Sequence, residues 1–376
     1  VLDTTEITST EYLNCSASGV GQGAQIGTSA NDYIYDIATD SSGNIYVTGY
    51  TYGAFSGFTN AGSTDAFLVK YSPEGAEQWH IQWGTSSGDT ARTMGVDSSG
   101  NIYVSGITAG SMHGEPIIGA NDAFLCKFTS DGVHLWTRIW GGVTSNDYAQ
   151  GLAIDGGDNI YIGGTTDGAM DGQIYQGGGA DTFLTKFTST GVKQWTRQRG
   201  TSASDNAIAV SCDNTGKVAL VGYTKASMDG QPLVGNNDIL LIQYTSAGVW
   251  QWTRMLGSSG NDYGWGVTAR ADNSLCLTGA AAGSIQSQPF AGGTSDALLA
   301  CYDTSGTLQW VRMWGTSSTD TPSDVGATTY GTLYVWSRIP GANLISVFSS
   351  DGVHEGGLQM DSASLDTTKG IAIDSE

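Results

Sequence analysis

Basic residues are scarce in this chain of 376 residues, and long apolar runs are absent. Lys and Arg together number 15 against 36 Asp and Glu, which gives a net charge of −21. Binding of nucleic acid or of an anionic membrane surface needs clustered Lys and Arg, so both are excluded as expected partners. No stretch approaches the roughly 18–20 apolar residues of a membrane span, and we therefore expect no direct membrane insertion.

Motifs for metal binding and catalysis are also missing. The five cysteines form no CxxC pair and the four histidines are scattered along the sequence, so we expect no metal site. GxSxG, P-loop, dinucleotide-binding and HExxH patterns do not occur, and we predict no enzyme activity and no cofactor. Cys276 and Cys301 fall on what should be neighbouring strands, where two interpretations stay open: a disulfide or two buried free thiols.

Features of secretion are sparse. The sequence begins at Val1, so we expect any targeting segment to have been removed or to lie outside it. Asn14, in the run Asn14-Cys15-Ser16, is the one acceptor pattern for N-glycosylation, which has meaning only in a secreted eukaryotic protein. Strong acidity favours solubility and suits extracellular or salty surroundings, and it fits a cytosolic protein too. We expect an extracellular or cell-surface location.

What the chain has in abundance is glycine, with 55 residues against 6 prolines, and a repeat that begins with glycine. Units start at Gly27, Gly84, Gly141, Gly200, Gly257 and Gly315. Each contains segments of 5–8 residues that are rich in β-branched and aromatic residues and bounded by Gly, Ser, Asp or Asn. Such segments indicate strands, and four of them per unit predict an all-β propeller of four-stranded antiparallel blades.

The ends of the chain decide the predicted number of blades. Residues 365–374 repeat the opening segment, and residues 11–26 resemble a third and a fourth strand. We therefore predict a single propeller domain over residues 1–376, with seven blades and the last closed by strands from both ends. The predicted units are 27–83, 84–140, 141–199, 200–256, 257–314 and 315–360, with the seventh blade from 361–376 plus 1–26.

One aspartate recurs at the start of every unit. Because a carboxylate repeated in every blade is unlike a catalytic pair, which is made once, we interpret the series as turn caps that accept backbone N–H groups. Cation binding is the alternative, with Ca²⁺ as the ion, although no DxDxDG loop occurs. The series consists of Asp32, Asp89, Asp147, Asp205, Asp262, Asp320 and Asp366.

Another position of the opening segment changes its chemistry in every unit. Residues that vary while the surrounding repeat stays constant are suited to determine binding specificity. We therefore predict that these residues ring the channel mouth and form a face for a ligand or partner. They are Tyr35, Arg92, Gln150, Ile208, Trp265, Ser323 and Lys369.

Five of the long connections carry a large apolar residue at matching places. We interpret it as a plug into each blade, with an exposed contact patch as the alternative. The residues are Phe55, Met112, Met170, Met228 and Ile285. The tryptophan that recurs in the fourth segment is interpreted as packing between blades, with sugar stacking as the alternative.

Four motifs recur in order over nearly the whole chain, with examples in GNIYVTGYT, DAFLVKY, NDYAQGLAID and KQWTRQRG. This arrangement resembles the seven-bladed β-propeller repeat family labelled SBBP. The resemblance implies a propeller in large secreted or surface proteins, without an assigned activity, and it transfers no catalytic residue.

Three functions follow as hypotheses. The first is a non-enzymatic extracellular or cell-surface protein that binds a protein partner or assembles with itself into a larger surface structure or filament. The second is a lectin-like propeller that binds a glycan through aromatic residues such as Tyr35 and Trp265. The third, which we expect least, is an enzyme with its site at the channel mouth.

Overall fold

The computed structural model describes residues 2–3, 11–15, 22–339, 342–361 and 370–373. All regular structure in these ranges is β-strand. The part of the chain that the structure describes has no helix long and apolar enough to cross a membrane.

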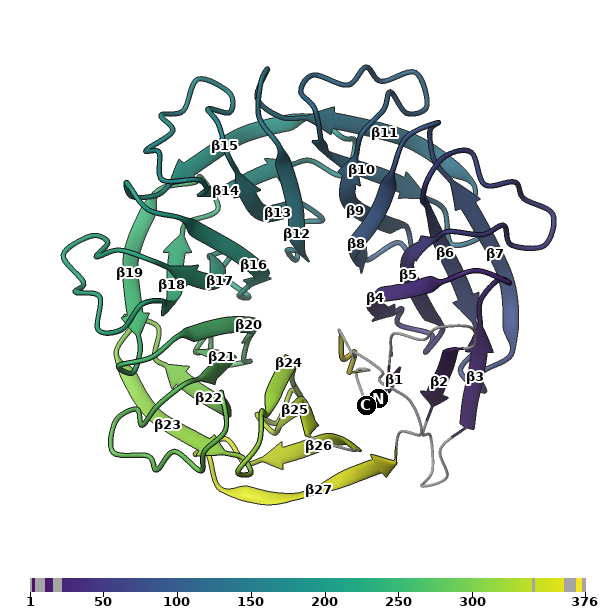
Figure 1. Cartoon of the computed structure of the whole chain (residues 1–376). Helices are drawn as coiled ribbons and strands as arrows, with labels where there is room; N and C mark the ends of the chain where they lie inside the picture. The colour runs from purple at the N-terminus through teal and green to yellow at the C-terminus, as the bar shows by residue number, and fades with distance from the viewer. Residues whose placement is uncertain (1, 4–10, 16–21, 340–341, 362–369, 374–376) are drawn as a thin grey trace.

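Six antiparallel sheets of four strands surround a central channel, each with its first strand innermost and its fourth outermost (Figure 1). Blades 1 to 3 are β4 (Asp32–Thr39), β5 (Ile45–Thr51), β6 (Asp65–Tyr71), β7 (Glu77–Trp83); β8 (Asp89–Val96), β9 (Ile102–Thr108), β10 (Asp122–Phe128), β11 (His134–Trp140); and β12 (Asp147–Ile154), β13 (Ile160–Thr166), β14 (Asp181–Phe187), β15 (Lys193–Arg199). Blades 4 to 6 are β16 (Asp205–Cys212), β17 (Val218–Thr224), β18 (Asp238–Tyr244), β19 (Trp250–Leu256); β20 (Asp262–Ala269), β21 (Leu275–Ala281), β22 (Asp296–Tyr302), β23 (Leu308–Trp314); and β24 (Thr321–Ala327), β25 (Leu333–Ile339), β26 (Ala342–Phe348), β27 (His354–Asp361).

The prediction of seven blades is wrong, because the structure has six blades of four antiparallel strands. The N-terminal residues form a separate sheet of three strands, β1 (Leu2–Asp3), β2 (Glu11–Cys15) and β3 (Gln22–Ile26). Much of the predicted closing strand from the C-terminus lies outside the described residues, and its described part, Gly370–Ile373, belongs to no strand. β1 is only two residues long and pairs with β2. Among the described residues, this N-terminal sheet therefore has three strands and no fourth.

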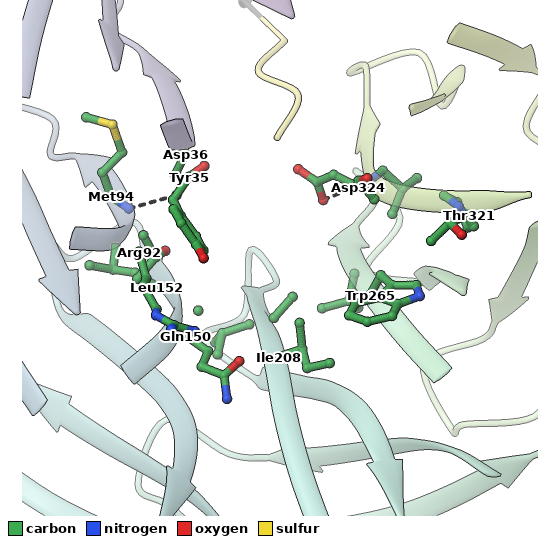
Figure 2. A pocket seen from close by; sticks show the side chains of 18 of the residues that line it. Tyr35, Asp36, Arg92, Met94, Gln150, Leu152, Ile208, Trp265, Thr321 and Asp324 are labelled. Carbon is green, nitrogen blue, oxygen red and sulfur yellow. Dashed lines mark hydrogen bonds between the residues drawn. The ribbon is translucent and has the colours of Figure 1, made fainter. Parts of the chain in front are cut away.

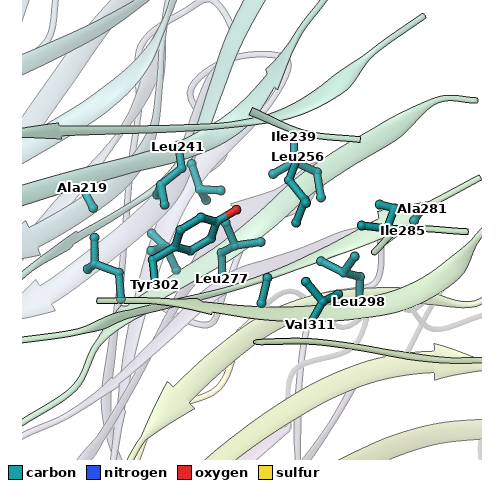
Figure 3. Close-up of a cluster of buried hydrophobic side chains, with 14 of the residues drawn as sticks. Ala219, Ile239, Leu241, Leu256, Leu277, Ala281, Ile285, Leu298, Tyr302 and Val311 are labelled. Carbon is teal, nitrogen blue, oxygen red and sulfur yellow. The ribbon is translucent and has the colours of Figure 1, made fainter. Parts of the chain in front are cut away.

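Apolar side chains form the core between neighbouring blades. Figure 3 shows one such cluster, in which Leu241 of β18 faces Leu277 of β21 and Tyr302 of β22. The middle strands of each blade are buried almost throughout, because blades cover both of their faces. The plug interpretation of the long connections is confirmed, since these five apolar residues are at most 7% exposed: Phe55, Met112, Met170, Met228 and Ile285.

The repeated tryptophan of the outermost strand packs against the next blade. Gly248, in the turn between β18 and β19, has a φ of +74°, and a Cβ added to it would lie 2.9 Å from Trp195. The Arg197 guanidinium lies over the Trp195 ring and donates from Nε to the Gly248 carbonyl at 2.8 Å. We call this contact, in which a glycine turn of one blade packs against the Trp and Arg of the preceding blade, the clamp. It recurs at Trp136 with Gly191, Trp252 with Gly306, and Trp310 with Gly352.

A disulfide joins Cys276 of β21 to Cys301 of β22, which are opposite each other in the antiparallel pair. Both residues are buried. Of the two interpretations left open by the sequence, the structure therefore has the bonded one. Asn14 lies in β2, where it pairs with Gly23 of β3.

Candidate functional site

The innermost strand of each blade is interrupted by a β-bulge at one position. In β8, for example, the pairing with β9 jumps from Ala91 to Thr93, so that Arg92 has no partner across the strand. A bulge inserts an extra residue and redirects its side chain. The residues skipped in this way are Tyr35, Arg92, Gln150, Ile208, Trp265 and Ser323.

These six bulge residues are the variable positions singled out in the sequence, and all of them line one cavity at the channel mouth. Its volume is about 530 Å³. Figure 2 shows Tyr35, Arg92 and Gln150 on one side of the cavity, and Trp265, Thr321 and Asp324 on the other. Lys369, the seventh predicted position, lies outside the described residues.

Two donors in this cavity lack an acceptor. Arg92 Nε and Trp265 Nε1 are buried and form no hydrogen bond among the described residues. The Arg92 guanidinium lies 5.3 Å from the centre of the Tyr35 ring, and within the described ranges it takes part in no ion pair. Arg338 of β25, which also lines the cavity, is likewise without an ion pair there. The channel mouth therefore presents guanidinium groups that form no direct ion pair with a carboxylate of the described residues.

Two carboxyl groups in the lining connect neighbouring segments. Asp36 Oδ2 accepts the backbone N–H of Met94 in the next blade at 2.7 Å. Asp324 Oδ2 accepts the backbone N–H of Ile371 at 3.1 Å, so that blade 6 is bonded to the C-terminal segment. A Cβ added to Gly370 would lie 3.1 Å from Asp36 Oδ1, which places Gly370–Ile371 between the two aspartates.

The same two aspartates are the most perturbed acids at the channel mouth. Burial raises the pKa of Asp36 to about 6 against the opposing effect of its backbone hydrogen bonds. Burial raises the pKa of Asp324 to about 7, and the charge of Asp36 adds to that increase. Sequence reasoning did not single out these residues, because the other blades have small residues at this position. The acidic exceptions were the signal available in the repeat: Thr93, Gly151, Ala209, Gly266 and Gly370 stand where these two blades have aspartate.

The repeated aspartates at the start of each blade are buried and accept hydrogen bonds from the turn before them. Asp89 accepts the Thr85 backbone N–H at 2.5 Å and the Thr85 hydroxyl at 2.8 Å. Asp32, Asp147, Asp205, Asp262 and Asp320 accept equivalent N–H groups. This is the geometry of a turn cap, and every member is at most 4% exposed. Asp366 lies outside the described residues.

A second set of chemically reactive side chains lies on the outer part of blade 2. His113 and His134 come from different segments of blade 2, and their ring centres are 4.0 Å apart. Cys126 completes the group, and the donor atoms of all three residues lie within 4.8 Å of one another. Comparing the repeats gives a partial signal: no other blade has a histidine at the position of His113, whereas blade 6 has His354 at the position of His134.

Comparison with known proteins agrees with the propeller. The family model described as Beta-propeller repeat (SBBP) matches two segments of the chain, residues 23–56 and 78–111. A regulatory protein named FlaEY from Caulobacter vibrioides is 26% identical over 274 residues, which are 68% of this chain and 28% of that protein. An uncharacterized WD repeat-containing protein from Acanthamoeba polyphaga mimivirus is 26% identical over 163 residues. The chain spans only 28% and 12% of the lengths of these two curated relatives.

Solved structures show the same fold at low sequence identity. A protein from Lactobacillus plantarum is 11% identical with a TM-score of 0.56, over 97% of this chain and 96% of that one. An ulvan lyase of polysaccharide lyase family PL25 is 10% identical with a TM-score of 0.52, over 90% and 88%. At these identities the likeness concerns the fold alone.

Proposed function

We propose that this β-propeller is a non-enzymatic binding protein that holds an acidic segment of a protein partner at its channel mouth. The observation that carries the proposal is Arg92. Its guanidinium lies in the cavity, its Nε lacks an acceptor, and among the described residues it forms no ion pair. A planar guanidinium matches a carboxylate in a bidentate geometry, so a carboxylate is the ligand group that this position favours.

The size and lining of the cavity support a ligand of side-chain or chain-end dimensions. A volume of about 530 Å³ lies within the usual range for sites that enclose small groups. Tyr35 and Trp265 provide aromatic surfaces on opposite sides, and Trp265 Nε1 is a second donor without an acceptor. A peptide segment with a carboxylate and adjacent apolar atoms would satisfy both donors.

The two aspartates of the lining support binding in preference to catalysis. Asp36 and Asp324 each accept backbone N–H groups from their own strand and from a neighbouring segment. Their oxygens are thus engaged in holding innermost segments together. A general base needs an oxygen that is free to reach a substrate proton.

The proposal places the protein outside the cell or at the cell surface, as part of a larger assembly. The Cys276–Cys301 disulfide supports an oxidising compartment, where such bonds persist. The net charge of −21 suits a highly soluble surface component. Fractionation of the source cells and light scattering of the purified chain test these two points. A reduced cytosolic pool, or a monomer at every concentration, would contradict them.

The binding proposal is tested with peptide arrays on which each acidic peptide is paired with its Asn or Gln counterpart. We expect the intact protein to prefer the acidic members, and Arg92→Gln to reduce that binding at least about tenfold, since a charge-assisted bond is worth roughly 1.5–3 kcal/mol. Lys225→Gln is the matched control, because it removes the same charge from an exposed site away from the cavity. Equal binding of acidic and amide peptides would overturn the proposal.

A lectin-like function is the second candidate, and the facing aromatic rings favour it. Sugars stack on such rings, and an acidic sugar would also pair with Arg92. A glycan array separates the two candidates. Binding of acidic glycans that is lost in Trp265→Ala, with no peptide binding, would establish the second candidate and remove the first.

A further inference from the structure

Donor atoms converge in blade 2 where the connection from β9 to β10 folds back onto β11. His113 Nδ1 and His134 Nε2 each lie 2.8 Å from Thr137 Oγ1, and Cys126 Sγ lies 3.2 Å from the same oxygen. The buried Thr137 hydroxyl thus marks a centre toward which two imidazole nitrogens and one sulfur point. This hydroxyl can donate one hydrogen and accept two, so it can serve all three groups while it holds their donor atoms around one point.

A second sulfur lies beside the first. Met112 Sδ is 4.0 Å from Cys126 Sγ, and both side chains are almost fully buried in the core of blade 2. His113 is exposed, so the group is open to solvent on one side. The set therefore consists of two nitrogens toward the surface and two sulfurs toward the core.

The other blades show that packing does not require these residues. In blade 3 the equivalent positions hold Asp171, Thr185 and Lys193, and Lys193 Nζ pairs with Asp171 at 2.5 Å. Thr196, the equivalent of Thr137, donates to the same carboxylate. Blade 4 has Asp229 in this place. In blades 3 and 4 the position provides a polar contact between loop and outer strand, and among the described blades only blade 2 combines two histidines with a cysteine at these places.

His113 is exposed at its outer edge and enclosed by neighbouring atoms on the other side, and this partial burial, followed by the neighbouring His134, lowers its pKa to about 4. Burial also lowers the pKa of His134. Burial raises the pKa of the Cys126 thiol to about 12, so metal binding has to displace its proton.

We propose that blade 2 binds a copper(I) ion through His113, His134 and Cys126, with Met112 as a fourth, weaker ligand. Thiolate and thioether sulfurs favour Cu⁺ among the first-row ions, and imidazole also suits copper. The Cys126 S–H bond breaks, a Cu–S bond forms and the proton leaves to solvent, with no change of oxidation state. Donor atoms around a tetrahedral ion lie about 3.5 Å apart, so the three residues have to approach by about 1 Å. Rotation of the exposed His113 ring and displacement of the Thr137 hydroxyl provide that movement.

The test uses Cu⁺ supplied as its coloured bicinchoninate complex under anaerobic conditions, and loss of colour measures transfer to the protein. The double variant His113→Asp with His134→Lys and the variant Cys126→Thr install the residues of blade 3. Asp is compatible with the backbone because Asp171 has a φ of 47° against 50° for His113. Met112→Ile copies Ile285 of blade 5, and Cys212→Ser is the thiol control.

We expect the intact protein to withdraw one equivalent of copper, and the double variant and Cys126→Thr to lose at least about 10- to 100-fold in affinity. Met112→Ile should bind more weakly than the intact protein, and Cys212→Ser should bind equally well. Circular dichroism and thermal unfolding establish that each variant is folded. Failure of the intact protein to withdraw copper, unchanged binding by the double variant, or displacement of Cu⁺ by equimolar Zn²⁺ would overturn the proposal.

Discussion

Asp36 is a buried acid whose proton is held more tightly in the folded chain than in the unfolded one. Its pKa rises from an ordinary 3.8 to about 6 through burial. The stability that the protonated form contributes is complete below about pH 4 and is lost as the pH rises through 6. A difference of about two pKa units corresponds to roughly 3 kcal/mol.

We therefore compare the free energy of unfolding of Asp36→Asn with that of the intact protein. The difference between the two should shift by about 3 kcal/mol in favour of the variant when the pH is raised from 4 to 8. Asn keeps an oxygen to accept the Met94 N–H and cannot ionise. Urea unfolding at the two pH values measures the change. A free-energy difference between the two proteins that is independent of pH would contradict the prediction.

Asp40 provides a control of opposite sign. Hydrogen bonds from Asn44, Ser42 and Tyr46 outweigh burial and lower its pKa. The stability that this carboxylate contributes is present above its ordinary pKa and is lost as the pH falls through the lowered value. Asp40→Asn should therefore differ most from the intact protein at neutral pH and least in acid.

At the scale of the element, the clamp between outer strands depends on glycine for two separate reasons. Gly248 has a φ of +74°, and it also leaves room for Trp195 and Arg197 of the preceding blade. Gly230 has a φ of +79° with nothing within 4 Å of an added Cβ. The two glycines share the backbone requirement and differ in packing.

We predict that Gly230→Ala destabilises the protein by about 1–2 kcal/mol, the cost of left-handed backbone for a residue with a Cβ. Gly248→Ala should cost about 1–3 kcal/mol more, because the methyl group displaces the tryptophan from the clamp. Urea unfolding of the two variants gives the comparison. Equal destabilisation would mean that the clamp contributes nothing measurable.

The strands themselves were predictable from sequence, whereas the contacts between them were less so. Runs such as DAFLVKY and IYVTGYT alternate with turn residues, and their limits follow from local chemistry. The bulges were not predicted, because a skipped residue at Arg92 leaves no local mark and depends on the pairing of β8 with β9. Likewise, His113 and His134 meet only because Cys126 pairs with Thr137 across β10 and β11.

At the scale of the molecule, similarity between segments was a poor guide to ring closure. Residues 365–374 resemble an opening strand in sequence, but their described part, Gly370–Ile373, belongs to no strand. Gly370–Ile373 contact Asp324 through Ile371 without joining a sheet. Counting repeats therefore predicted the architecture and overestimated the number of complete blades.

Net charge is a property of the whole molecule, and it predicts how salt acts on stability. A charge of −21 in one compact body repels itself, and salt screens that repulsion. We predict that the melting temperature at neutral pH rises between low salt and about 0.3 M NaCl, by roughly 1–2 °C for each kcal/mol of relieved repulsion.

Differential scanning calorimetry at two pH values checks this prediction. Near pH 4.2, the isoelectric point of the sequence, the effect of salt should disappear because the net charge is then close to zero. A salt effect of equal size at both pH values would point to ion binding or to a general effect of the salt on apolar surface.

The bulges also bear on how such a protein diversifies. Each bulge residue occupies its own strand, and regular pairing resumes on both sides of it, so a substitution at one leaves the register of the others unchanged. Free-energy effects of such substitutions should add, except where side chains touch, as Arg92 and Tyr35 do. Selection can then vary the channel mouth one blade at a time on a constant scaffold. A combinatorial library restricted to these positions would sample new specificities without endangering the fold.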